Sequence, residues 1–168
     1  MTLKLALAAV VVVGCGLCGA AMTRSANRRW RLLRETADGL RQLRVQIVHL
    51  QEPLDRALRQ SGSSLFALAA DHLDGASCAA EAWRRAWETA GRRGGEGDCL
   101  AGRDVRALER LFDRLGESGR AGQQEAIRAC LATVEAAAEE ARSRAAEVSR
   151  LYTAVGLLVG LAVAVLLI

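Results

Sequence analysis

Aromatic residues and proline are scarce in this sequence. Only 4% of the residues are Phe, Trp or Tyr, and Pro53 is the single proline. Few β-branched residues lie outside the two apolar ends, while Ala, Leu, Arg and Glu dominate. This composition disfavours strands and favours helices. The sequence therefore predicts an all-α protein.

Regular cysteine spacing and histidine ligand sets are absent as well. The five cysteines are odd in number and irregularly spaced, which argues against a disulfide framework. Cys15 and Cys18 form a C-x-x-C motif inside an apolar run, where small membrane residues are a better interpretation than a redox or metal site. His49 and His72 have no Cys or acidic residue at ligand spacing. We expect no metal and no cofactor.

Catalytic and nucleic-acid-binding patterns are also missing. The sequence has no GxxxxGK[ST] motif and no Gly-x-Ser-x-Gly elbow. Its carboxylates alternate with arginines along helical faces, which is typical of a solvated surface. The net charge of +4 comes mostly from one arginine cluster, without interleaved aromatic residues. We therefore predict neither an enzyme, nor a small-molecule substrate, nor a nucleic-acid partner.

Long apolar runs are present at both ends of the chain. Residues 151–168 carry no charge, and as a helix they extend about 27 Å, close to the thickness of a hydrocarbon core. Residues 3–22 predict a first transmembrane helix. A secretory signal peptide, or a lipoprotein cleavage site ending at Cys15, is the alternative. Gly156 and Gly160 have the spacing that lets two membrane helices pack closely, although glycine is common in such helices.

Arginines flank the inner side of both apolar runs. Five follow the first run, namely Arg24, Arg28, Arg29, Arg31 and Arg34, and three more precede the second run. Positive charge marks the cytoplasmic side of a membrane protein. The sequence thus predicts three parts: a transmembrane helix at 3–22, a cytoplasmic helical domain at 23–150 and a transmembrane helix at 151–168. The lipid bilayer is the first expected partner.

Helical periodicity divides the middle of the chain into segments. Helices are predicted at 26–51, 54–60, 65–73, 78–90, 104–115 and from about 121 into the apolar tail, which makes an antiparallel bundle of about six. The first has a buried stripe comprising Leu33, Thr36, Leu40, Leu43, Ile47 and Leu50. Pro53 ends this helix and starts the next. Trp83 and Trp87 predict a core pair, with a binding surface as the alternative. The glycine-rich segment 91–98 predicts a flexible, solvated loop.

Several short motifs follow in an order that resembles a known family. The chain is similar to stage III sporulation protein AB of endospore-forming bacteria, over its whole length. The positions that carry the resemblance, besides Gln46-Ile47-Val48, are Pro53, Trp83, Gly116, Ser118, Gly122, Gln123 and Tyr152. The chain departs from the family pattern at His49, Gly119 and Ala121, and the 91–98 loop looks like an insertion.

The resemblance implies a function that spacing alone does not show. The family belongs to a transenvelope complex made in the mother cell, in the membrane around the forespore. Its cytoplasmic domain is similar to that of type II secretion platform proteins. The resemblance therefore implies a scaffold that docks an ATPase, stage III sporulation protein AA. Whether the chain forms a homo-oligomer is left open by the sequence. The alternatives are a platform subunit of a type II secretion or type IV pilus-like system, and a membrane-anchored sensor domain.

Overall fold

The computed structural model describes residues 27–117 and 119–167 of the 168-residue chain. Within these ranges every regular element is a helix and no residue is in a strand, so the predicted all-α class is confirmed. The chain divides into two compact units. One is residues 31–139, the bundle, and the other combines Met1–Trp30 with Glu140–Ile168.

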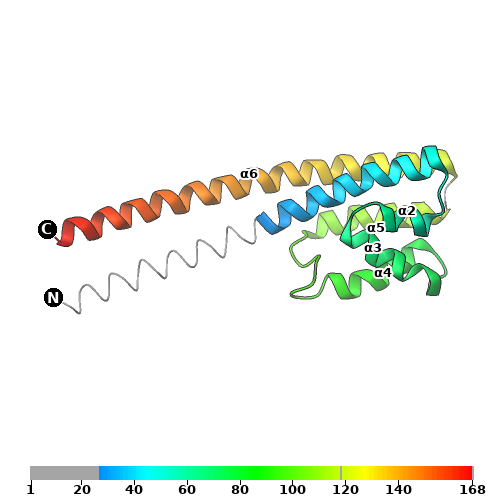
Figure 1. Cartoon of the computed structure of the whole chain (residues 1–168), viewed down its shortest axis with the longest axis horizontal. Helices are drawn as coiled ribbons and strands as arrows, with labels where there is room; N and C mark the ends of the chain where they lie inside the picture. Colours follow the sequence, from blue (N-terminus) through cyan, green and yellow to red (C-terminus); the bar gives the residue numbers. More distant parts are fainter. Residues whose placement is uncertain (1–26, 118, 168) are drawn as a thin grey trace. The chain divides into compact units, whose positions relative to one another are not determined.

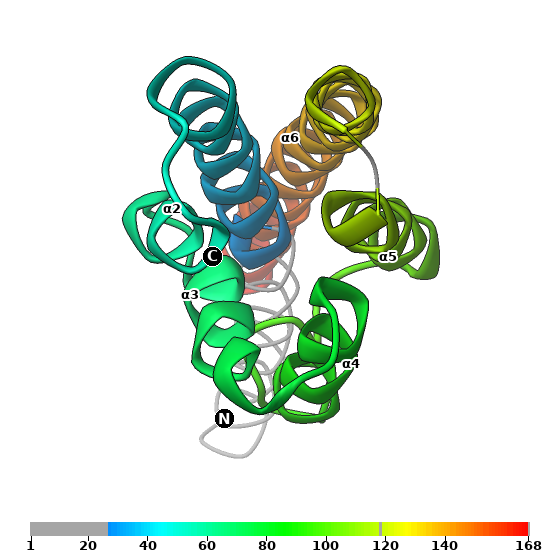
Figure 2. The ribbon, with the colours of Figure 1, turned by 90° about the vertical axis from the view of Figure 1, so that its right-hand side faces the viewer.

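The elements of the structure lie close to the predicted ranges (Figure 1). A first helix covers residues 27–45 and continues as a short π-helix. The remaining bounds are η1 Gln46–Leu50, α2 Leu54–Gln60, α3 Ser64–Asp71, η2 Leu73–Gly75, α4 Ala79–Ala90, α5 Gly102–Glu117 and α6 Arg120–Leu167. The 3₁₀ turn η2 was not predicted. Within the bundle the helices follow one another in chain order around a shared core (Figure 2).

Three aromatic rings form the centre of that core. The Trp83 ring of α4 stacks on the Phe112 ring of α5, with centroids 4.8 Å apart, and the Phe66 ring of α3 meets Phe112 edge-on at 6.0 Å. All three side chains are at most 2% exposed. Trp83 is thus a core residue, as predicted, whereas Trp87 is only half-buried. Burial of each such ring contributes about 1.5–3 kcal/mol to folding.

The first helix packs closely against the start of α3. A Cβ on Gly39 would lie 2.8 Å from the Cβ of Ser63 and 3.3 Å from the Phe66 ring. Glu35, one turn earlier, accepts a hydrogen bond from the Ser64 backbone N–H at 2.7 Å. This carboxylate satisfies one of the free N–H groups at the start of α3, where the Ser63 side chain makes no capping bond. The glycine inside the first helix therefore serves helix packing.

The predicted buried stripe of the first helix is correct except at its last position. Leu33, Leu40 and Leu43 are at most 1% exposed, whereas Leu50 is 63% exposed. The chain forms a π-turn from Gln46 to Leu50, which takes one more residue per turn than an α-helix. The extra residue rotates Leu50 out of the stripe. The prediction that Leu50 is buried was therefore wrong, because it assumed an unbroken 3.6-residue period.

The glycine-rich loop is more closely packed than its composition suggests. The Gly97 N–H donates to the Ala90 carbonyl at 2.8 Å, and the Gly94 N–H donates to Asp98 Oδ2 at 2.9 Å. A Cβ on Gly97 would lie 2.5 Å from the Trp87 ring. The loop is folded against Trp87, and Gly97 is buried. We expected a solvated loop, and only part of the loop is solvated.

Residues 3–22 lie outside the described residues, as do the side-chain surroundings of Gly156 and Gly160 within α6. In the part of the chain that the structure describes, no helix includes an apolar stretch of membrane-spanning length.

The packing of Gly97 gives a stability prediction. Replacing Gly97 with alanine should lower the free energy of unfolding by about 1–3 kcal/mol, because the new methyl group would overlap the Trp87 ring. Gly102→Ala is the matched control, since its Cβ would meet only the end of the Arg106 side chain, at 3.5 Å. Thermal and urea unfolding of the full chain in detergent measure both. Equal stability of the two variants would contradict the close packing of this loop.

Candidate interaction surfaces

Gln123, a position of the family motif, stabilises the junction between α5 and α6. Its side-chain Nε2 donates a hydrogen bond to the Leu115 carbonyl at 2.9 Å. That carbonyl is one of the last four of α5, which have no partner within the helix. The Gln123 N–H in turn donates to the Gly119 carbonyl at 3.1 Å. The Gly-Gln signature therefore fixes a helical turn, a role that sequence reasoning did not assign to it.

The other motif positions are spread over the fold. Pro53 is exposed and directly precedes α2, as predicted, and Trp83 lies in the core. Gly116 lies inside α5, which continues to Glu117, two residues beyond the end of the helix predicted at 104–115. Gly122 and Tyr152 belong to α6, and Ser118 lies outside the described residues. These positions do not meet in one site.

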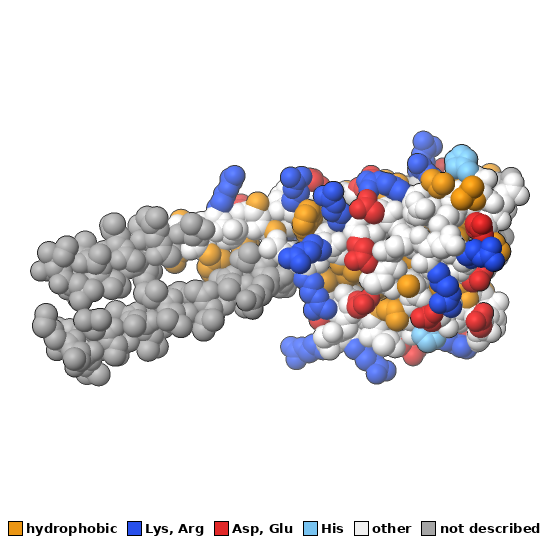
Figure 3. Space-filling model, viewed as in Figure 1, with side chains coloured by type: hydrophobic (Ala, Val, Ile, Leu, Met, Phe, Trp, Pro, Cys, Tyr) orange, Lys and Arg blue, Asp and Glu red, His pale blue; other side chains and the backbone are white. Residues whose placement is uncertain are grey.

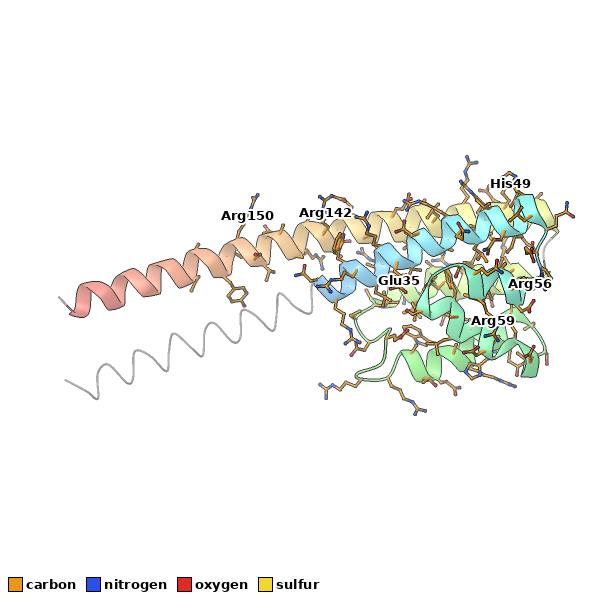
Figure 4. The ribbon with its side chains drawn as sticks, viewed as in Figure 1. Glu35, His49, Arg56, Arg59, Arg142 and Arg150 are labelled. Atoms are coloured by element: carbon orange, nitrogen blue, oxygen red, sulfur yellow. The ribbon has the colours of Figure 1, made fainter. Side chains whose placement is uncertain are left out.

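The predicted topology-setting arginines lie at the beginning of the first helix. Arg28, Arg31 and Arg34 are exposed and Arg29 is half-buried, while Arg24 lies outside the described residues. On α6, Arg142 and Arg150 extend away from the helix (Figure 4).

The end of the first helix has an unusual backbone. Gln51 has φ +56°, the left-handed region in which a non-glycine residue is uncommon. The N–H groups of Gln51 and Glu52 both donate to the Gln46 carbonyl, so the helix is closed by a motif that usually uses glycine. Gln46 itself is buried, and its Nε2 donates to Gln60 Oε1 on α2 at 3.3 Å. The π-turn is therefore held in place by the last residue of α2.

This turn exposes apolar side chains. Among the described residues of the bundle, Val45 at 40% and Leu50 at 63% are the exposed large hydrophobic side chains. Apolar atoms gather at this end of the molecule beside His49 (Figures 3 and 4). We call Val45 and Leu50 the apolar patch. Asp55 follows it at the start of α2, exposed and without an ion-pair partner among the described residues.

A groove of about 290 Å³ lies between α5 and α6 within the bundle. Its apolar lining includes Ala107 and Leu111 of α5 and Ala126 and Cys130 of α6. Its charged lining comprises Arg110, Arg114 and Glu125. We call this hollow the α5–α6 groove. Sequence reasoning missed it, although alanines at facing positions of two helices were a usable signal, because small side chains leave space between helices.

The cysteine in this groove is chemically inert. Cys130 is 4% exposed, and burial raises the pKa of its thiol to about 12, although the nearby Arg110 lowers it slightly. A thiol of this kind is neutral near pH 7, and the thiolate is the nucleophile. Cys130 is therefore part of the groove wall.

Several described carboxylates are engaged in structural interactions. The pKa of Glu81 is lowered, mainly because the Ser77 backbone N–H donates to its carboxylate and also because Arg85 lies beside it. Arg41 forms an ion pair with Glu135 that joins the first helix to α6 and raises the pKa of the arginine. Among the described residues, no three His, Cys, Asp or Glu side chains are grouped to hold a metal ion.

These features define a small helical-bundle protein whose candidate sites are surfaces. The family model for stage III sporulation protein AB matches residues 4–168. The chain is also similar to a solved structure of a stage III sporulation protein AB (SpoIIIAB), with 26% sequence identity and a TM-score of 0.60. That match covers 71% of this chain and 97% of the other. No curated protein matches the chain.

The chain belongs to the stage III sporulation protein AB family. The resemblance inferred from the motifs is thereby confirmed, and the membership supports a role in sporulation.

The Gln123 hydrogen bond gives a second prediction. Gln123→Ala should lower the free energy of unfolding by about 1 kcal/mol, because the Leu115 carbonyl loses its partner. Gln124→Ala is the matched control, because the Gln124 side chain is exposed and its removal should change stability little. Urea unfolding of both variants measures the difference. A similar loss in both would mean that the hydrogen bond contributes nothing.

The burial of Cys130 gives a third prediction. At pH 8 its alkylation by iodoacetamide should be about a thousandfold slower than that of an ordinary free thiol, because its pKa is raised to about 12. The exposed Cys78 is the internal control. Peptide mass spectrometry of the full chain, before and after denaturation, measures both sites. Rapid labelling of Cys130 in the folded chain would show that the groove opens.

Proposed function

We propose that this chain is a non-enzymatic membrane platform of the mother-cell complex that supports forespore development. The observation that supports this most is membership of the stage III sporulation protein AB family over residues 4–168. A bundle with a tightly packed aromatic core and no grouped metal-ligating side chains among its described residues fits a scaffold. A scaffold needs a fixed shape and exposed surfaces.

Membrane anchorage through 3–22 and 151–168 is part of the proposal. Large apolar side chains become exposed on α6 where the predicted span begins, with Leu151 at 61% and Val155 at 44%. Such side chains one turn apart suit a lipid environment better than water. The exposed Arg142 and Arg150 precede them, as expected on the cytoplasmic side of a span. The proposal therefore puts the bundle in the mother-cell cytoplasm, anchored to the membrane around the forespore.

Docking of a partner ATPase completes the proposed function. The family resemblance implies stage III sporulation protein AA as that partner. A cytoplasmic bundle is accessible to a soluble ATPase, and a rigid core suits it to transmit force to the membrane.

Deletion of the gene in its spore-forming host tests the proposed function. The proposal predicts an arrest of forespore development that the intact gene restores, with normal growth before sporulation. Normal spores from the deletion strain would contradict a role in this complex. A defect in growing cells would instead favour a subunit of an ordinary secretion or pilus system.

The arginines give a separate prediction about topology. Replacing Arg28, Arg29 and Arg31 together with glutamate should invert or mix the orientation of the chain, because the positive charge beside the first span is removed. Reporter fusions in the bundle measure its side of the membrane. The matched control replaces Arg84, Arg92 and Arg93, which are exposed elsewhere on the bundle. An unchanged orientation in the first variant would show that these arginines do not set topology.

A further inference from the structure

The positive charge of the chain is concentrated beside its two apolar runs. Residues 23–34 and 140–150 together contain eight arginines and two glutamates, a surplus of six positive charges, whereas the whole chain has a net charge of +4. The rest of the chain is therefore slightly acidic. One of the two carboxylates, Glu140, already pairs with Arg144 at 2.5 Å. The surplus beside the apolar runs is thus not neutralised by carboxylates of the same segments.

Arg31 and Arg150 are exposed members of this set with no ion-pair partner in the described part of the chain. Glu35 lies four residues after Arg31, a spacing at which helical side chains pair, but its carboxylate instead accepts the Ser64 backbone N–H at 2.7 Å. Glu147 is exposed, three residues before Arg150, and makes no ion pair with it. The Arg150 side chain extends away from α6 (Figure 4). Two guanidinium groups are therefore accessible to an anion from outside the chain.

Two aromatic side chains accompany these arginines. Four of the six aromatic residues of the chain form ring contacts inside the bundle. The other two are Trp30, directly before Arg31, and Tyr152, two residues after Arg150, and both are half-buried. Tryptophan and tyrosine favour the interface between a membrane and water, where the ring contacts lipid and the polar group contacts water. An arginine and an aromatic residue therefore occur together near each apolar run.

The two arginines are close in sequence to the predicted spans. Arg150 directly precedes the span at 151–168, which begins with the exposed Leu151. The headgroup layer extends about 5–8 Å beyond the hydrocarbon core, or about three to five residues of helix. With the span anchored as proposed, Arg150 lies within that layer, and its long side chain can extend to the lipid phosphates. Arg31 follows the span at 3–22 by nine residues, and a negative lipid surface attracts cations over about 8 Å beyond itself.

We propose that the arginines beside the two apolar runs bind the headgroups of anionic phospholipids. Arg31 and Arg150 supply the cationic contacts, because a guanidinium group donates paired hydrogen bonds to a phosphate. Trp30 and Tyr152 hold the two helices at the interface. A phospholipid suits the site better than a soluble phosphate compound, because its acyl chains also cover exposed apolar side chains such as Leu151. The position of the arginines at a lipid surface rests on the proposed membrane anchorage.

Lipid titration of the purified full chain in a neutral detergent tests this inference, since orientation in a membrane plays no part there. The probes are phosphatidylglycerol, zwitterionic phosphatidylcholine and glycerol 3-phosphate, and native mass spectrometry measures how much of each is bound. Phosphatidylglycerol should bind about tenfold more tightly than either of the others. Equal binding of the two lipids would overturn the preference for an anionic headgroup. Equally tight binding of glycerol 3-phosphate would overturn the phospholipid as the ligand.

Substitution of the arginines provides the second arm. R31Q and R150Q should each weaken phosphatidylglycerol binding about fivefold, because each cation near the headgroups contributes separately. R31K and R150K keep the charge and should retain most of the affinity. R84Q and R128Q are the matched controls, because Arg84 and Arg128 are exposed on α4 and α6 and also have no ion-pair partner among the described residues. Thermal unfolding without lipid checks that each variant is folded.

The outcomes separate this inference from the proposed function. Unchanged binding by R31Q and R150Q would overturn the inference, and so would an equal loss in R84Q and R128Q, because net charge alone would then explain the binding. Lysine variants as weak as the glutamine variants would contradict attraction by charge. Membrane fractionation of cells that make the full chain tests anchorage separately. A chain missing from the membrane would contradict the proposed platform, whereas an anchored chain without a preference for phosphatidylglycerol would overturn only this inference.

Discussion

The fold depends on the burial of the Phe66, Trp83 and Phe112 rings between three helices. The helices α2, α3 and α4 have only 7, 8 and 12 residues, too few to be stable alone in water. Their stability must come from packing, and the aromatic stack joins α3, α4 and α5 at one point. The first helix also packs closely against the same Phe66 ring, at Gly39. These three side chains thus determine how the helices pack, and the packed helices determine the shape of the bundle surface.

Helix positions could be predicted from the sequence because they follow from local rules. Pro53 and the turn that begins at Ser61 placed α2 at its observed bounds, and Pro53 ended the first helix as predicted. The exposure of Leu50 could not be predicted in this way. The π-turn before it depends on Gln46, which reaches Gln60 on another helix, and on Gln51 in a left-handed conformation. A tertiary contact overrode the local period at that place.

The candidate surfaces were predictable to a smaller degree. The arginines beside the apolar runs and the motif positions were found from the sequence, and the structure gives Gln123 and Trp83 structural roles. The α5–α6 groove depends on the distance between two helices, which periodicity does not determine. The glycine-rich loop shows the same limit, because composition indicates flexibility while the Trp87 ring decides which glycines are packed. Family membership supports a role in sporulation, and the geometry identifies the candidate surfaces.

The proposed platform requires a bundle held on the cytoplasmic side of a membrane by both ends of the chain. Trypsin added to intact spheroplasts of cells that produce the full chain tests it most directly. Arg92 and Arg93 are exposed in a loop and provide cleavage sites. Cleavage of the bundle there is expected only after the spheroplasts are lysed. Cleavage at this loop in intact spheroplasts would contradict it.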